Sequence, residues 1–461
     1  MAHLATTPRI PAAVWALGFV SLLMDISSEL IHSLLPVFMV TTLGTSVLAV
    51  GLIEGLAEAT ALMVRVFSGA LSDYLGRRKP LAVFGYGLGA LSKPLFALAT
   101  ATGMVLAARL IDPLKIAAQR AAAATGAHLT AHGFSEVPAS RGESAYVVDV
   151  GPFYLASIVE CLGSKALVAD EMHKLTGKSY YDAIAQDTIA MAINDLITVG
   201  ATPLVVQAYW AAGGSDWFGD AQRAQALVAG WKQACDTCGV AWGGGETPAL
   251  AGIVEAGRID LAASCTGLIQ PKERLSVGDR LGAGDAVVLL SSSGIHANGL
   301  SLARKLVERL PQGWLTPLSD GSTYGEALLA PTVLYSPVTE ALFKAGIVPH
   351  YCANVTGHGW RKLLRHPAKL TYRLNAIPKV PPVLRFIQEQ ARQDDREAYS
   401  TLNMGAGFAL FVAAQDAQRT VDVAQACGIE ALVAGHVEAG DKQLLIEPLG
   451  IRFGDDDLQL R

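Results

Sequence analysis

The sequence predicts a two-domain α/β (α+β) protein preceded by about three transmembrane helices. From residue 145 onward, strand-like apolar runs alternate with helical ones. A turn-rich segment near residue 280 divides these runs into two halves. Apolar stretches of bilayer length occur only before residue 112. The chain therefore combines a membrane-like beginning with a longer part that has the pattern of an enzyme domain pair.

Composition narrows the classes of function. A chain of 461 residues exceeds one ordinary domain. Its net charge of −5 and pI near 6.1 argue against a nucleic-acid partner, because no basic surface is available to neutralise phosphates. The mean hydropathy of +0.35 averages two unlike parts. Six cysteines scattered along a long chain indicate buried free thiols rather than disulfides, and the lone pair Cys235 and Cys238 lacks the second pair that a zinc site requires.

Three early stretches, at about residues 14–40, 46–71 and 80–102, are long enough to cross a bilayer. The loop at residues 69–79 resembles the loop between the second and third helices of major facilitator superfamily transporters. That resemblance implies a cytoplasmic latch formed by an acid and a basic cluster, here Asp73, Arg77 and Arg78. The positive-inside rule also places this loop in the cytoplasm. Only a truncated transporter is present, so we do not expect transport.

Three spans that start inside the cell would leave the remaining chain outside, where an ATP-using domain finds no nucleotide. Residues 104–124 could complete a fourth span or lie on the membrane as an amphipathic helix, or the whole segment could be a relic that never inserts. We expect attachment to the inner or cell membrane with a cytoplasmic catalytic part. If the segment is a relic, we expect a cytoplasmic protein.

The predicted organisation has five parts, which are a transporter-like segment (1–112), a linker (113–144), an N-terminal domain (145–281), a C-terminal domain (282–450) and a tail (451–461). Period-2 and period-3.6 patterns predict elements in both domains. The predicted strands are 146–150, 154–159, 204–210, 259–269, 286–291, 370–374, 407–413 and 443–447. The predicted helices are 184–199, 221–238, 300–310 and 417–427, and residues 327–345 form a long apolar run.

The helix predicted at 184–199 carries acids on an apolar background. Asp187 and Asn194 are seven residues apart and nearly in register on a 3.6-residue repeat, with Asp195 beside them. Acids held against apolar residues need a positive partner. A magnesium–nucleotide complex is one such partner, and a neighbouring Lys or Arg is the other.

Glycine and polar motifs follow the predicted strands. Glu160 leads through a glycine and a hydroxyl to Lys165, a grouping that suits a metal-bridged phosphate, although a plain turn with a surface lysine explains the same residues. Glu246 directly follows Gly244 and Gly245, which allow close approach of a ligand. The segment 291–299 suits a phosphate, and its His296 could titrate near neutrality. Turns at 356–359 and 403–407 are of the same kind.

These motifs, in this order, resemble the aminoimidazole ribonucleotide synthetase (phosphoribosylformylglycinamidine cyclo-ligase) family over about residues 146–448. The resemblance implies that family's two-domain synthetase fold, a homodimer with the nucleotide site at its interface, and ATP and Mg²⁺ as cofactors. It implies transfer of the γ-phosphoryl group of ATP to the formyl oxygen of a purine precursor. A nitrogen of the same substrate then closes the imidazole ring, and ADP and phosphate leave.

The resemblance also implies residue roles. The catalytic residues would be Lys165, Asp195 and His296. The nucleotide would contact Glu160, Lys165, Asp187, Asn194, Asp195, Gly244, Gly245 and Glu246. The purine precursor would contact Ser293, His296, Asn298, Thr356 and Gly357. Four acids far apart in the sequence are expected to converge on one magnesium-loaded triphosphate, namely Glu160, Asp187, Asp195 and Glu246.

Several positions depart from the family pattern. Glu160 stands where Asp is usual, Ile295 replaces a common proline, and His358 interrupts a run of glycines. The glycine-rich segment that normally precedes the first strand is missing. These departures leave two alternatives open, a phosphotransferase of the same fold that resembles thiamine-phosphate kinase, and a non-catalytic membrane-tethered nucleotide-binding fusion. Relatives of the fold that depend on particular cysteines fit less well, because the chain ends without one.

Overall fold

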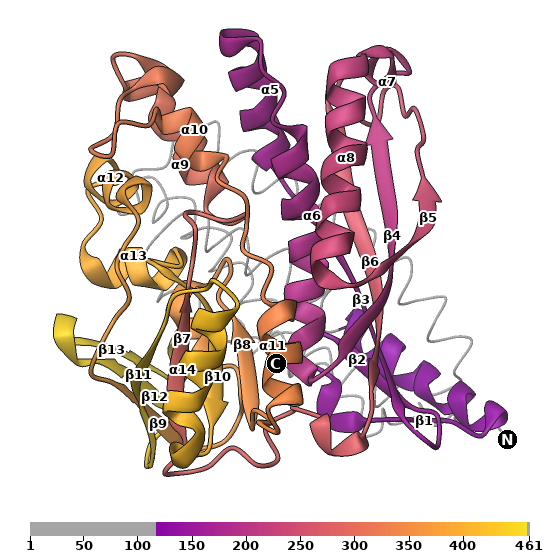
Figure 1. Cartoon of the computed structure of the whole chain (residues 1–461), viewed down its shortest axis with the longest axis vertical. Helices are drawn as coiled ribbons and strands as arrows, with labels where there is room; N and C mark the ends of the chain where they lie inside the picture. Colours follow the sequence, from indigo (N-terminus) through magenta and orange to yellow (C-terminus); the bar gives the residue numbers. More distant parts are fainter. Residues whose placement is uncertain (1–116, 459–461) are drawn as a thin grey trace, which may run out of the picture. The chain divides into compact units, whose positions relative to one another are not determined.

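The structure, a computed structural model, describes residues 117–458 (Figure 1). Residues His128–Arg461 form one compact unit and Met1–Ala127 another. The three predicted spans and the transporter-like loop lie outside the described residues. Between residues 117 and 458, no helix is both long enough and apolar enough to cross a bilayer.

The first half of the compact unit contains a six-stranded sheet in the order β1-β2-β3-β6-β4-β5. Neighbouring strands are antiparallel except β4 and β5, which are parallel. The strands are β1 (Ser135–Glu136), β2 (Tyr146–Asp149), β3 (Tyr154–Cys161), β4 (Thr202–Ala212), β5 (Ala241–Glu246) and β6 (Ile259–Ile269). The helices are α5 (Lys165–Thr176), α6 (Tyr181–Leu196), α7 (Asp216–Gly219) and α8 (Ala221–Cys238).

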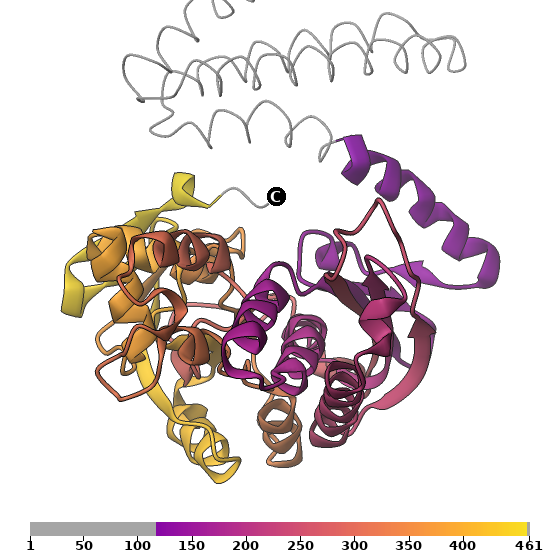
Figure 2. The ribbon, with the colours of Figure 1, turned by 90° about the horizontal axis from the view of Figure 1, so that it is seen from above.

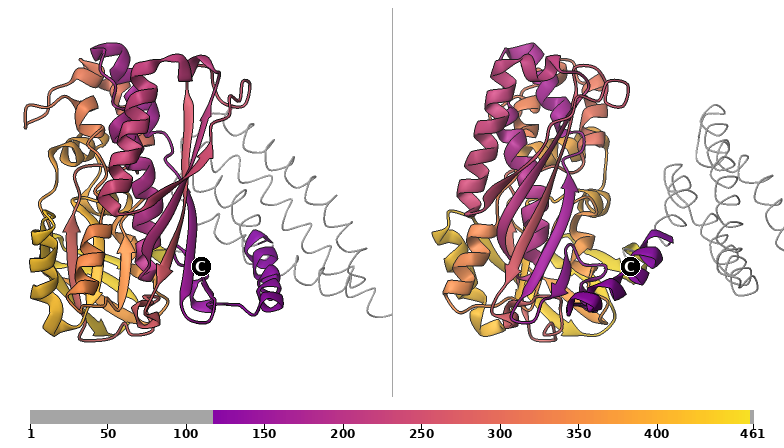
Figure 3. Two further views of the ribbon diagram at one scale, coloured as in Figure 1. Left: turned by 45° about the vertical axis from the view of Figure 1, so that its right-hand side comes forward. Right: turned by 90° about the vertical axis from the view of Figure 1, so that its right-hand side faces the viewer.

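Among residues 128–458, this sheet is covered on one face only. Strand β6 alternates buried and more exposed residues along its whole length, as expected for a half-buried strand. Helices α6 and α8 lie on the covered face (Figure 3). On the open face, Val159 is 70% exposed and Tyr209 is 38% exposed. The open face therefore leaves large apolar side chains in contact with solvent.

The second half contains a seven-stranded sheet in the order β13-β12-β9-β11-β7-β10-β8. Strands β7 and β10 are almost entirely buried, because helices and loops cover both faces at the centre. The strands are β7 (Ala286–Ser291), β8 (Tyr351–Asn354), β9 (Leu370–Leu374), β10 (Ala406–Val412), β11 (Ala431–Ala439), β12 (Gln443–Ile446) and β13 (Ile451–Gly454). The helices are α9 (Leu300–Leu306), α10 (Tyr324–Leu328), α11 (Ser336–Lys344), α12 (Pro382–Ala391), α13 (Asp395–Thr401) and α14 (Ala417–Ala426).

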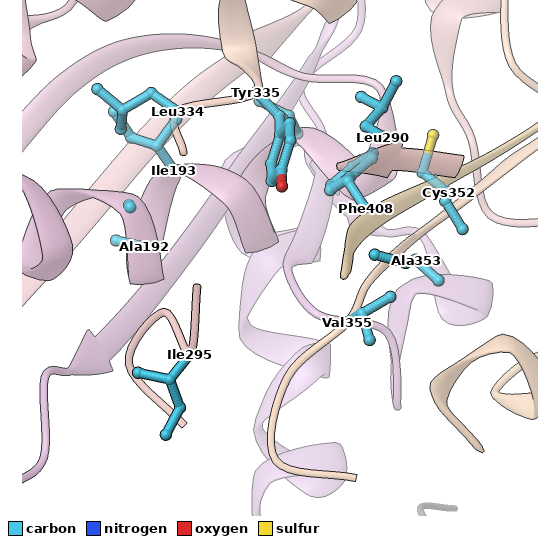
Figure 4. Packing of buried hydrophobic residues seen from close by; sticks show 14 of the residues in the cluster. Ala192, Ile193, Leu290, Ile295, Leu334, Tyr335, Cys352, Ala353, Val355 and Phe408 are labelled. Atoms are coloured by element: carbon cyan, nitrogen blue, oxygen red, sulfur yellow. The ribbon is translucent and has the colours of Figure 1, made fainter. Parts of the chain in front are cut away.

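Helix α6 lies between the two halves (Figure 2). Its Gln186 and Asn194 side chains donate to the carbonyls of Thr332 and Val333, each at 2.8 Å. Apolar residues continue the contact, since Ile193 of α6 lies near Leu334 and the strands β7, β8 and β10 pack behind Tyr335 (Figure 4). The two halves therefore share one core, and α6 carries polar groups to the boundary between them.

The sequence predictions for the elements are largely confirmed. Helix 221–238 and strands 259–269, 286–291 and 370–374 have the predicted bounds. The helix predicted at 184–199 begins at Tyr181 and ends in a short 3-10 turn, Ile197–Val199. The apolar run 327–345 is not one element, because Pro331 and Pro337 cannot continue a helix and an extended stretch separates α10 from α11.

Several elements were not predicted, namely β1, α5, α7, α12, α13, β8, β11 and β13. The predicted linker is wrong in its last part, where β1 pairs with β2 and Arg141 forms an ion pair with Glu136. The predicted tail contains β13, which adds an edge strand to the second sheet. Four of the six cysteines are buried free thiols as predicted, but Cys161 is exposed.

Candidate functional site

Lys165 and Asp187 form a buried ion pair at the boundary of the two halves. The Lys165 ammonium donates to Asp187 Oδ1 at 2.9 Å and to the Ala330 carbonyl at 2.8 Å. Asp187 Oδ1 also accepts from the Thr332 amide and hydroxyl, at 2.8 and 2.5 Å. Both charged side chains are fully buried. The positive partner of Asp187 is therefore a lysine, which was the alternative to a metal, and Lys165 is not the surface lysine of a plain turn.

Burial dominates the electrostatics of this pair. It lowers the pKa of Lys165 and raises the pKa of Asp187, and the attraction between the two charges opposes both shifts. All donors reach Oδ1, so the buried Asp187 Oδ2 has no hydrogen-bond partner. A buried acceptor without a partner costs free energy, so Asp187 Oδ2 is an uncompensated acceptor at the boundary of the two halves.

A second charged cluster forms where Asp195 leaves the end of α6. Asp195 Oδ1 accepts from the Asn354 amide of β8 at 2.7 Å. Glu160, near the end of β3, is close enough that the Asp195 charge raises its pKa. Burial raises the pKa of both acids, and two cations of the second half, Lys362 and Arg365, oppose that rise. We name Glu160, Asp195, Lys362 and Arg365 the boundary cluster.

The carboxyl of Glu160 is the group of this cluster that titrates near neutrality. Desolvation, then the charge of Asp195, raises its pKa to about 7. A carboxyl whose folded pKa lies above its unfolded value stabilises the fold most below the unfolded value. That stabilisation is lost as pH rises through about 7.

We therefore expect Glu160→Gln to be more stable than the wild type at pH 8 by about 1 to 2 kcal/mol, a value reduced for solvent screening. At pH 4.5 the difference should vanish, because the wild-type carboxyl is then protonated in the fold. Thermal unfolding between pH 4.5 and 8 measures this, with Glu255→Gln, an exposed acid, as control. Parallel stability curves for wild type and Glu160→Gln across that range would contradict the assignment.

His296 does not titrate near neutrality, which corrects the expectation from sequence. Burial, then the charge of Lys165, lowers its pKa to about 3. Its Nε2 accepts from the Ser293 amide at 3.3 Å, so the proton of the neutral ring lies on Nδ1. Its backbone has φ of 58°, a strained value for a side chain with Cβ. His296 is therefore positioned as a neutral hydrogen-bond donor.

The loops predicted to contact substrate are brought together in part. Ser293 donates its hydroxyl to the Pro331 carbonyl at 2.5 Å, next to the segment that holds Asp187. Gly357 lies against Asn298, since a Cβ added to this glycine would come 3.3 Å from the Asn298 oxygen. Thr356 precedes Gly357 at the end of β8. The loops 291–299 and 356–359, which we name the two glycine loops, thus meet, although more than fifty residues separate them in the sequence.

Asn194 does not join the acids. Its amide nitrogen donates to the Val333 carbonyl at 2.8 Å, and its oxygen accepts from the Tyr335 amide at 3.1 Å. Both ends of the side chain are therefore used to attach α6 to the segment before α11. Asn194 holds the two halves together in this structure.

Glu246 also lies apart from the other acids. Across the sheet, Glu246 of β5 lies opposite Tyr209 of β4, and Tyr209 lies opposite Ala262 of β6. Ala262 in turn lies opposite Cys161 of β3. Paired residues point to the same face of a sheet, so Glu246 lies on the open face with Cys161, whereas Glu160 faces the helices. Three strand spacings amount to about 14 Å. Gly244 and Gly245 share this edge strand, and a Cβ on Gly245 would clash with the backbone of Ala208.

The predicted convergence of four acids is therefore wrong for a single chain. Asp187 and Asp195 are separated by about 12 Å along α6, because a helix rises 1.5 Å per residue. Among residues 117–458, no group of three or more His, Cys, Asp or Glu side chains is arranged to hold a metal ion. Of the four acids, Glu160 and Asp195 are the pair that interact electrostatically in the described part of the chain.

Two carboxylates nevertheless fit a magnesium ion that arrives with a nucleotide. Such ions are held by one or two carboxylates, with phosphate oxygens and water completing the shell. Glu160 and Asp195 supply that donor set, and Lys362 and Arg365 supply positive charge beside it. The boundary cluster can therefore accept a metal-bridged phosphate.

Sequence reasoning missed five contributors to these contacts. They are the Ala330 carbonyl, Thr332, Asn354, Lys362 and Arg365. Two features of the sequence could have pointed to them. Pro331 and Thr332 interrupt the apolar run 327–345, and basic residues follow the turn at 356–359. All five come from the second half and meet the first half only in the folded chain.

Fold and site together define a two-domain α+β synthetase class of protein with its polar groups at the boundary between halves. Comparison with known proteins narrows this class. Residues 142–269 match the family model "AIR synthase related protein, N-terminal domain", and residues 282–446 match the corresponding C-terminal domain. The chain belongs to the AIR synthase related family.

Two of the proteins that the chain is similar to are cyclo-ligases. The chain is 34% identical over 303 residues to a phosphoribosylformylglycinamidine cyclo-ligase of Methanocaldococcus jannaschii, covering 65% of this chain and 83% of that relative. It is 33% identical over 309 residues to the cyclo-ligase of Carboxydothermus hydrogenoformans, covering 65% and 86%. The crystal structure of E. coli HypE, a hydrogenase maturation protein, is similar with a TM-score of 0.44 and 18% identity, covering 60% and 80%.

Proposed function

We propose that the chain is an ATP-dependent cyclo-ligase that converts phosphoribosylformylglycinamidine to aminoimidazole ribonucleotide, with release of ADP and phosphate. The observation that carries this proposal is the 34% identity to a cyclo-ligase of which the chain covers 83%. The boundary cluster supports it, because two acids and two cations that act on one another electrostatically suit a metal-bridged triphosphate.

The reaction begins with transfer of the γ-phosphoryl group to the formyl oxygen of the substrate. This turns a poor leaving group into phosphate, and a nitrogen of the same substrate then attacks the activated carbon. Such chemistry asks the protein mainly for positioning and charge neutralisation. Magnesium, when bound, neutralises charge on the triphosphate, and Glu160 and Asp195 would hold it. Lys362 and Arg365 add positive charge from the opposite side of the boundary.

The substrate contacts are assigned to the two glycine loops. Ser293, Asn298, Thr356 and Gly357 lie in these loops, and His296 would donate its Nδ1 proton to a substrate or phosphate oxygen. Because the pKa of His296 is lowered to about 3, this ring acts as a neutral donor at physiological pH rather than as a base that changes its charge. Asp187 would use its unpartnered Oδ2 toward ligand, while Lys165 supports it.

We also propose that the protein is a homodimer whose nucleotide site lies at the interface. The open face of the first sheet supports this, because Val159 and Tyr209 are both exposed on it, and large apolar side chains grouped on one face mark an interaction surface. Glu246, Gly244 and Gly245 are at the edge of that sheet, so a partner subunit could return them to the site. The reaction belongs in the cytoplasm, where ATP is available, whether or not residues 1–112 attach the chain to a membrane.

The proposal is tested with the full-length protein, Mg-ATP and phosphoribosylformylglycinamidine. We expect ADP and inorganic phosphate in equal amounts, together with one equivalent of aminoimidazole ribonucleotide. Thiamine phosphate serves as the control acceptor and should release no ADP.

A thiamine-phosphate-kinase-like enzyme would instead form ADP and a phosphorylated product without free phosphate. Binding of Mg-ATP without turnover on either substrate would favour the non-catalytic alternative. Either result would overturn the cyclo-ligase assignment.

A further inference from the structure

Tyr335, the residue before α11, is bonded to both halves of the chain. Its backbone amide donates to Asn194 Oδ1 of α6 at 3.1 Å. Its hydroxyl donates to the carbonyl of Ser291, the last residue of β7, at 2.8 Å. The ring is fully buried and lies beside Phe408 of β10, with 5.3 Å between the ring centroids (Figure 4). The side chain is therefore held in one position by contacts from the first and the second half.

The same ring lies next to His296. The two ring centroids are 6.3 Å apart, and the ring planes are inclined by 55°. Gly407, at an irregularity in the pairing of β10 with β7, lies against both side chains. A Cβ added to this glycine would overlap the Tyr335 hydroxyl oxygen and come within 2.6 Å of His296 Cε1. The backbone of Gly407 is not left-handed, so space rather than conformation requires a glycine beside these two rings.

The conformation of His296 needs support from its surroundings. Its φ of 58° is strained for a residue with Cβ, and strained residues persist only where neighbouring groups fix them. Within its own loop, its Nε2 accepts from the Ser293 amide at 3.3 Å, which is long for a hydrogen bond. Within residues 117–458, no hydrogen bond joins its Nδ1 to another group. One long bond does not determine the ring orientation, so packing against Tyr335 supplies the remaining constraint.

We propose that Tyr335 is a positioning residue that fixes the imidazole of His296 for the reaction. Its hydroxyl holds the carbonyl at the start of the loop 291–299, and its ring limits rotation of the imidazole. Because its amide is bonded to α6, it also fixes His296 relative to the helix that carries Asp187 and Asp195. This inference rests on the proposed function, because the cyclo-ligase reaction is what uses His296 as a donor. It adds a residue that acts through His296 rather than on a ligand.

The test is Tyr335→Phe in the full-length protein, which removes the hydroxyl and keeps the ring in the core. We expect kcat for substrate-dependent ADP release to fall roughly tenfold, because a small misplacement of a positioned group slows the reaction. The KM for phosphoribosylformylglycinamidine and the affinity for Mg-ATP should stay within about twofold of the wild type, because no ground-state contact is removed.

Tyr324→Phe is the matched control. Tyr324 is also fully buried, and its hydroxyl donates to the Ala303 carbonyl at 3.0 Å. Its ring packs against Phe386 of α12. Each variant loses one bond from a tyrosine to a backbone carbonyl, so the two unfolding temperatures should fall to a similar extent. Only Tyr335→Phe should lose turnover.

A spectroscopic signature reports the imidazole itself. In protein labelled with ¹³C at histidine Cε1, the His296 signal is assigned by its loss in His296→Gln. We expect this signal to shift in Tyr335→Phe, because Gly407 brings the hydroxyl and Cε1 close together, and to stay in place in Tyr324→Phe. Gly407→Ala adds a methyl group at this point, so it should shift the signal as well and lower kcat roughly a hundredfold.

The outcomes separate this inference from the proposed function. Wild-type turnover in Tyr335→Phe, or an equal loss in Tyr324→Phe, would overturn the inference, and so would an unmoved His296 signal. A wild type without turnover would refute the proposed function instead. The His296 signal needs no substrate, so it would still decide whether Tyr335 positions the ring.

Discussion

Replacing Lys165 with methionine is expected to lower the free energy of unfolding by about 3 to 5 kcal/mol, the usual cost of removing one partner of a buried ion pair. Asp187 would keep its hydrogen bonds from Thr332 but lose the cation with which it forms an ion pair. Methionine approximates the lysine stem in volume, so the loss reports the charge rather than a cavity. Urea unfolding of the full-length protein measures the difference.

A double variant and a surface variant serve as controls for this measurement. Combining Lys165→Met with Asp187→Asn removes both charges and should recover much of the loss. Lys174→Met, on the same helix α5, breaks an exposed pair with Glu171 and should change stability by less than about 0.5 kcal/mol. A stability of Lys165→Met within the range of Lys174→Met would show that the pair does not hold the halves together.

Replacing Asp195 with asparagine is expected to lower kcat for substrate-dependent ADP release by about two to three orders of magnitude, while the protein stays folded. The variant keeps an oxygen that can accept from Asn354, so the contact between α6 and β8 survives. What is lost is the negative charge that faces Glu160, Lys362 and Arg365. Turnover and thermal unfolding must be measured on the same preparations.

Asp182→Asn is the matched control, because Asp182 is an exposed acid in the first turn of the same helix. Its kcat should remain that of the wild type. If Asp195→Asn retained more than about a tenth of wild-type turnover, Asp195 would not belong to the reacting site and the boundary cluster would be a structural network.

Local patterns in the sequence were sufficient for most elements. The helix Ala221–Cys238 has an amphipathic repeat, begins after the N-cap Asp220 and ends before a left-handed Gly239, so its bounds were predictable. Strand Ile259–Ile269 alternates along its whole length. Helix α5 was missed because its start looked like a phosphate-binding turn, and because its buried face mixes the charged Lys165 and Asp170 with apolar residues.

From the sequence, the kinds of residue in the site could be predicted, but not which of them lie next to one another. Asp187 and Asp195 could be recognised as costly acids on an apolar helix, but their partners could not. Lys165 lies 22 residues before Asp187, and Thr332 lies 145 residues after it. Sheet register placed Glu246 on the face opposite Glu160, which no local pattern reveals.

By itself, the sequence determined the family, the alternation of elements and the acids that burial makes costly, because periodicity and motif order are local properties of a chain. The tertiary structure alone decided which charges meet. It paired Asp187 with Lys165, separated it from Asp195, and brought Lys362 and Arg365 of the second half to Glu160. Electrostatic energy depends on distance and burial, and both are set by how the two halves pack around α6.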